Sequence, residues 1–91
     1  MIRVPLRIPD KGSAIRKWAA MLADTAGRFD SGIMIEYGST TVNAKSMLGL
    51  LTAVSGPDGT LVLVADGADE EQAIHAILAL TRDVSADGGH V

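Results

Sequence analysis

The sequence predicts an α+β domain in which helices cover one face of a four-stranded, mostly antiparallel sheet. Four short runs of residues have the apolar alternation or the β-rich composition that is typical of strands. Three further segments carry apolar residues at the spacing of helices. Along the chain these segments read strand, helix, strand, strand, helix, strand, helix. Helices packed on one face of the sheet would bury the apolar sides of both.

The first strand is expected at residues 3–8, where aliphatic residues occupy every second position. Pro5 cannot donate to a neighbouring strand, which predicts a place at the edge of the sheet. The turn at residues 9–12, Pro-Asp-Lys-Gly, ends this strand. Ser13 is expected to cap the first helix and Gly27 to end it. The inward face of this helix is predicted to carry Ile15, Trp18, Ala19, Leu22 and Ala26.

A hairpin is predicted next. Residues 33–37 alternate between apolar and other positions, a Gly-Ser pair gives a tight turn, and residues 40–43 return as the second strand. The following helix is opened by Ser46. It should end before residues 55–59, Ser-Gly-Pro-Asp-Gly, because this run breaks helices.

The last strand is expected at residues 60–65, in the centre of the sheet and covered on at least one face. Asp69 and Gln72 resemble a capping box at the start of the last helix. A single domain is expected over residues 1–84, followed by a flexible tail at residues 85–91. The first helix would join two parallel strands by a right-handed crossover that leaves room for the last strand between them. The inward face of the last helix is predicted to carry Ile74, Ile77, Leu78 and Thr81.

Composition narrows the class of protein. The 91 residues suffice for one domain. The absence of cysteine excludes disulfides, thiol nucleophiles and thiolate metal sites, and it suits a cytoplasmic protein. A net charge of −3 and an aromatic content of 3% argue against nucleic acid as a partner. We expect no signal peptide, because Arg3 and Arg7 interrupt the first apolar run. We expect no membrane partner, because no apolar stretch approaches the roughly 20 residues of a membrane span.

The segment from residue 42 to residue 54 is the one that most suggests a site. Ser46 is a favoured helix N-cap, because its hydroxyl can accept from the free N–H groups of the first helical turn. The residues after it are too apolar for the single buried face of a short helix. Part of this surface should therefore face solvent or a partner. Leu50 is expected in the core, and a protein-binding patch is expected from Lys45, Met47, Leu48 and Leu51.

The element order and several motifs resemble HPr, the phosphocarrier family of the bacterial sugar phosphotransferase system. The likeness is strongest at residues 36–37, 42–50 and 67–70. It implies an open-faced β-sandwich fold and a role in carbon catabolite regulation. In Gram-positive members the serine that Ser46 matches is phosphorylated by an ATP-dependent HPr kinase/phosphorylase. The phosphoserine form binds a LacI-type catabolite regulator, and Enzyme I and IIA components are further partners that the resemblance implies.

The resemblance breaks at the family's phosphoacceptor motif, Gly-(apolar)-His-x-Arg-Pro-Ala, at the start of the first helix. Residues 12–19 here read Gly-Ser-Ala-Ile-Arg-Lys-Trp-Ala. The histidine position falls on Ile15, or on Ala14 in a register shifted by one. Neither alkyl side chain has a lone pair for phosphoryl transfer. The two histidines, His75 and His90, lie in the last helix and the tail. The chain is thus similar to the Crh-like members, which lack the histidine and keep the serine.

We therefore expect a non-catalytic regulatory protein that acts through Ser46 phosphorylation and protein docking, with no cofactor and no metal site. Two alternatives stay open, namely a phosphocarrier with an atypical acceptor and an interaction domain with no phosphate switch. Ser46 is interpreted either as an N-cap alone or as a phosphorylation site. Arg16 and Lys17 are interpreted either as solvated charges or as the remnant of a phosphate-binding helix terminus that joins the protein-binding patch.

Overall fold

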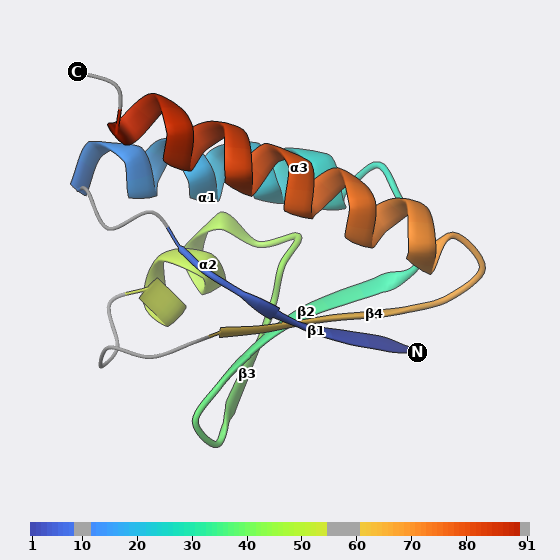
Figure 1. Ribbon diagram of the computed structural model, residues 1–91. Coiled ribbons are helices and arrows are strands. Elements are labelled where there is room, and N and C mark those ends of the chain that lie inside the picture. Colours follow the sequence, from blue (N-terminus) through green and yellow to red (C-terminus); the bar gives the residue numbers. More distant parts are fainter. Residues whose placement is uncertain (9–11, 55–60, 90–91) are drawn as a thin grey trace.

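The described part of the computed structural model covers residues 1–8, 12–54 and 61–89, with the backbone alone at 12–13 and 85–89. Its elements follow the predicted order. They are β1 (Ile2–Leu6), α1 (Gly12–Ala26), β2 (Gly32–Tyr37), β3 (Thr40–Asn43), α2 (Met47–Val54), β4 (Leu61–Asp66) and α3 (Glu70–Gly89). Figure 1 shows the three helices on one side of the sheet. The predicted open-faced α+β architecture is therefore confirmed.

The strands lie in the order β1-β4-β2-β3, and each neighbouring pair is antiparallel. Because β1 and β2 each pair antiparallel with β4, they run parallel to each other on either side of it. α1 joins these two strands, and β4 lies between them, as predicted. Pro5 lies on the edge strand β1, as its missing N–H predicted. Gly38 opens the two-residue turn between β2 and β3 with a φ of 58°, a conformation that glycine adopts without steric cost.

The core lies between the sheet and the helices. The sheet contributes Leu6, Ile33, Ile35, Leu61, Leu63 and Ala65. α1 and α3 pack against each other above this layer. Trp18 is completely buried, and its indole Nε1 donates to Thr81 Oγ1 at 2.9 Å. The Thr81 hydroxyl in turn donates to the carbonyl of Ile77 at 2.8 Å. Trp18 therefore joins the two helices and is part of the packing.

Two helices are longer than predicted. α1 begins at Gly12, so Ser13 lies inside its first turn and not before it, and the prediction of a Ser13 cap is wrong. α3 continues through Gly89, which makes the backbone of residues 85–89 helical. The flexibility expected for residues 85–91 stays a prediction. The described residues leave out positions 9–11 of the turn predicted at 9–12, the whole helix-breaking run predicted at 55–59, residue 60 of the last predicted strand, and His90.

The start of α3 also differs from the prediction, because Asp69 and Gln72 do not form the expected capping box. The Asp69 carboxylate accepts instead from the N–H groups of Asp30 and Ser31, each at 2.9 Å, and from the Ser31 hydroxyl. The turn before α3 is closed by Glu70, whose carboxylate accepts from the N–H of Gly67 at 3.0 Å. Asp69 thus ties the loop after α1 to the start of α3.

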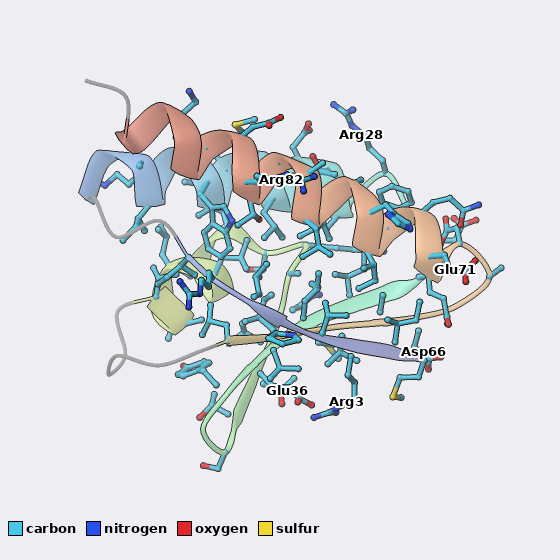
Figure 2. The ribbon with its side chains drawn as sticks, in the orientation of Figure 1. Arg3, Arg28, Glu36, Asp66, Glu71 and Arg82 are labelled. Atoms are coloured by element: carbon cyan, nitrogen blue, oxygen red, sulfur yellow. The ribbon has the colours of Figure 1, made fainter. Side chains whose placement is uncertain are left out.

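The face of the sheet opposite the helices carries an ion pair across two strands. Arg3 of β1 and Glu36 of β2 lie beside each other in Figure 2. Two guanidinium nitrogens donate to the two carboxylate oxygens, one of them at 3.0 Å. β4 lies between these strands, and its Val64 is buried although it points away from the core. The candidate site residues all lie elsewhere, on the helices and on the turn before α2.

Candidate functional site

Ser46 lies in a tight turn that joins β3 to α2. Its N–H donates to the carbonyl of Asn43 at 3.0 Å, and its carbonyl accepts from the N–H of Leu50 at 3.0 Å. The side-chain oxygen of Asn43 accepts from the N–H of Lys45 at 2.9 Å, which makes an Asx turn. The Ser46 hydroxyl accepts from the N–H of Gly49 at 3.2 Å, so the predicted N-cap is confirmed. The turn therefore holds an exposed hydroxyl at the positive end of α2.

Lys45 precedes Ser46 in the chain, but its ammonium group is engaged elsewhere. Lys45 Nζ donates to the carbonyl of Phe29 at 2.9 Å, in the loop after α1. The next two residues of that loop donate their N–H groups to Asp69. These hydrogen bonds lower the pKa of the Asp69 carboxyl, the Ser31 hydroxyl first and the N–H of Asp30 next. The loop after α1 is thus held between the start of α3 and the turn that carries Ser46.

The apolar residues of α2 divide between the core and the surface. Leu50 is completely buried, as predicted, and Leu51 is half-buried and packs against the core. Leu48 is 76% exposed and Met47 is 40% exposed. The α2 patch, defined as Met47, Leu48 and Leu51, therefore presents most of its apolar surface at its first two residues, directly after Ser46.

Gly49 lies in the first turn of α2, where this helix packs against β3. A Cβ at this position would lie 3.4 Å from both the carbonyl oxygen of Asn43 and the Cβ of Val42, which is the near limit of ordinary van der Waals contact, so a small side chain fits there. The sequence did not reveal the role of Asn43 in the turn, although an Asn followed two residues later by a free N–H is a local signal for an Asx turn.

The stretch at the position of the phosphoacceptor motif, residues 12–19, lies in the first turns of α1. Ile15 and Ala14 are half-buried. Because α1 begins at Gly12, the N–H groups from Arg16 onward are bonded within the helix and do not face an anion. Arg16 and Lys17 are both exposed. α1 packs against α2, as Figure 1 shows, but the contribution of these two cations to the α2 patch stays a prediction.

His75 lies far from the start of α1. It is exposed on α3, six residues before Thr81, which contacts Trp18. Six residues correspond to about 9 Å along a helix axis. In Figure 1 the start of α1 lies beside the end of α3, so His75 is displaced toward the opposite end of the helix pair. It is a surface residue, as expected, and it does not lie at the start of α1.

The described part of the chain contains neither a metal-binding cluster nor a membrane-spanning helix. Within residues 1–8, 12–54 and 61–89, no group of three or more His, Asp or Glu residues is placed to hold a metal ion. Among the helices of the same residues, none combines the length and the apolarity that crossing a membrane requires.

Comparison with known proteins connects this site to a family. Residues 6–83 match the family model described as PTS HPr component phosphorylation site. The HPr-like protein Crh of Halalkalibacterium halodurans is 41% identical over 61 residues, which are 67% of this chain and 73% of that protein. The phosphocarrier protein HPr of Treponema pallidum is 35% identical over 77 residues, 85% of this chain and 88% of that protein. The crystal structure of an HPr from Thermoanaerobacter tengcongensis superposes with a TM-score of 0.82 at 32% identity, covering 94% of this chain and 97% of that one.

Proposed function

This chain belongs to the HPr family, and from that premise we propose that it is a non-catalytic regulator of the bacterial sugar phosphotransferase system. Members of the family are phosphocarriers and not catalysts in the usual sense. In this proposal the acceptor histidine is replaced by Ile15, or by Ala14 in the shifted register, and regulation acts through phosphorylation of Ser46. The observation that carries the proposal is the exposed Ser46 hydroxyl at the N-terminus of α2, next to the exposed side chain of Leu48.

The environment of Ser46 favours a phosphate. A phosphoserine carries a charge of about −1.5 to −2 at neutral pH. It would stand where the backbone N–H groups of α2 point outward and where the helix dipole is positive. The first turn of α2 contains no acidic residue that would repel it. The hydroxyl only accepts in its hydrogen bond with Gly49, so its own proton is available for transfer to a kinase. Phosphorylation should leave the fold intact and change the surface that a partner contacts.

The α2 patch supplies the docking surface for such partners. By resemblance these are HPr kinase/phosphorylase and, for the phosphorylated form, a LacI-type catabolite regulator. Leu48 is the strongest candidate for an anchor, because a 76% exposed leucine has most of its surface left to bury in an interface. A protein with these partners would act in the bacterial cytoplasm.

Incubation with HPr kinase/phosphorylase and ATP, followed by mass spectrometry of the intact protein and its peptides, tests the proposal. We expect one phosphate on Ser46. Ser46→Ala should remove it, and Ser39→Ala is the matched control, because Ser39 is an exposed serine in a turn that does not open a helix. Phosphate on Ser39, or none at all, would contradict the switch.

A working phosphocarrier is the second candidate, since the family match includes the start of α1. Incubation with phosphoenolpyruvate and Enzyme I would then add an acid-labile phosphate. We expect no label, because Ile15 and Ala14 offer no nucleophile and the N–H groups from Arg16 onward are bonded within α1. A label at any position would favour the carrier over the regulator.

The third candidate is an interaction domain that reads no phosphate. Binding of the purified LacI-type regulator to the wild type, to Ser46→Asp and to Leu48→Asp separates this candidate from the first. A regulator needs the negative charge, whereas a phosphate-independent domain binds equally well with and without it. Loss of binding in Leu48→Asp alone would favour the third candidate.

A further inference from the structure

All four methionines of the chain lie at its surface. The exposed fractions are 70% for Met1, 39% for Met21, 42% for Met34 and 40% for Met47. Methionine is usually among the more buried residue types, so this distribution is unusual. None of the four belongs to the buried core cluster, and the chain has no cysteine. Oxidation of sulfur would therefore not place a polar group among the described core residues.

The four thioethers lie on different parts of the molecule. Met1 precedes β1, Met21 lies on α1, and Met34 lies on β2 between the core residues Ile33 and Ile35, hence on the opposite face of the sheet. Met47 alone belongs to the α2 patch. It is the first residue of α2, between the Ser46 hydroxyl and the exposed Leu48.

We propose that Met47 is a site of reversible oxidation by peroxide, and that its sulfoxide weakens docking at the α2 patch without unfolding the domain. The second part of this proposal, that the sulfoxide weakens docking, is called the docking half below, and it rests on the proposed function. In the reaction the Met47 sulfur takes one oxygen from hydrogen peroxide. The O–O bond breaks, an S–O bond forms, the sulfur is oxidised by two electrons, and the peroxide is reduced to water. Methionine sulfoxide reductases reverse the change.

The structure explains why the product would be disruptive at this position. A thioether is apolar and adapts to an irregular partner surface, whereas a sulfoxide is polar and must keep a hydrogen-bond partner when it is buried. In the free protein the Met47 sulfoxide stays in contact with water, so the fold loses little. In an interface the sulfoxide would be desolvated beside Leu48. The sulfoxide therefore weakens the free energy of binding and leaves the free energy of unfolding almost unchanged.

Peptide mapping of the full-length protein tests the site of oxidation. Trypsin separates the four methionines onto residues 1–3, 18–28, 29–45 and 46–82, so the added oxygen atom can be assigned peptide by peptide. After treatment with hydrogen peroxide we expect oxidation of Met47, with unchanged far-ultraviolet circular dichroism and a cooperative thermal transition. A reduced Met47 in peroxide that oxidises the other three, or loss of the cooperative transition, would overturn the proposal.

Phosphorylation of Ser46 by HPr kinase/phosphorylase tests the docking half. We expect peroxide treatment to lower kcat/KM about tenfold, which corresponds to about 1.4 kcal/mol. Met47→Leu keeps the volume and the apolar character but removes the thioether, so kcat/KM of this variant should be the same before and after peroxide treatment, whatever its starting value. Met34→Leu is the matched control, because it removes an equally exposed thioether outside the α2 patch and should stay sensitive.

The outcomes separate the two proposals. If the untreated wild type takes no phosphate, the proposed function fails and the docking half of this inference fails with it, while the peptide map still decides the site of oxidation. If the untreated protein is phosphorylated and the oxidised protein is phosphorylated equally well, the docking half fails alone. If Met47→Leu remains sensitive to peroxide, the effect belongs to another methionine and the inference is wrong.

Discussion

The hydrogen bond between Trp18 and Thr81 is the contact whose removal gives the clearest test of the helix packing. The indole Nε1 lies 2.9 Å from Thr81 Oγ1, and the indole side chain is completely buried. Trp18→Phe removes the donor and part of the ring. The lost bond costs about 1 kcal/mol. The unfilled ring volume costs about another 1 kcal/mol, for a total of about 2 kcal/mol.

Thr81→Val acts on the same bond from the other side. It keeps the shape of the side chain and leaves the buried indole N–H without its partner, at a cost of about 1–3 kcal/mol. The double variant should be less destabilised than the sum of the two single variants, because the bond is lost only once. We expect an interaction energy of about 1 kcal/mol.

Urea unfolding measures these free energies. Trp18 is the only tryptophan, so its fluorescence reports the α1–α3 packing directly in Thr81→Val, while circular dichroism serves for Trp18→Phe. A cost of about 2 kcal/mol should lower the melting temperature of a domain of this size by about 8–16 °C. Thr52→Val is the matched control. Its hydroxyl makes the same bond to a carbonyl four residues earlier, Leu48 at 2.9 Å, but it is exposed and has no indole partner.

Two results would contradict this role of the hydrogen bond. The first is a double-mutant cycle that gives no interaction energy, and the second is a Thr52→Val variant that is destabilised as much as Thr81→Val. The first result would mean that the indole finds another partner, and the second that the cost comes from the threonine's own helix and not from the contact between helices.

Three further predictions concern the site and its support. Ser46→Ala should destabilise the fold by about 1 kcal/mol through loss of the N-cap, with Ser39→Ala unchanged in the same thermal melt. Ile15→His should take up no acid-labile phosphate from phosphoenolpyruvate and Enzyme I, because the backbone N–H groups beyond it are bonded within α1; a labelled variant would show that the histidine alone is missing. The pKa of the Asp69 carboxyl is lowered in the folded protein, chiefly by the Ser31 hydroxyl, so the carboxylate of the unfolded chain is protonated first as the pH falls. The stabilisation that Asp69 contributes is complete above the ordinary carboxyl pKa of about 4, and it is lost as the pH falls through the lower pKa of the folded protein. Asp69→Asn should reduce the loss of stability between neutral and acid pH, measured as the free energy of unfolding across that range.

Much of the fold could be predicted because the pattern of apolar residues is local. Alternating apolar residues predicted strands, and Pro5 predicted that the first of them lies at the edge of the sheet. The apolar excess after Ser46 correctly predicted that Leu48 is exposed while Leu50 is core. The capping box at Asp69 was predicted wrongly, because its carboxylate binds residues 30 and 31, which are distant in the sequence and which no local motif reveals.

The sequence alone determined which chemical groups this protein has. It contains a serine at a helix start, no cysteine, and no histidine between residues 12 and 19. Only the tertiary structure decided how these groups are presented. In the folded protein the Lys45 ammonium donates to the carbonyl of Phe29, the side chain of Leu48 is exposed, and all four thioethers lie outside the core. The physical reason is that the identity of a side chain fixes what it can donate, accept or bury, whereas its exposure depends on elements that meet only after the chain has folded.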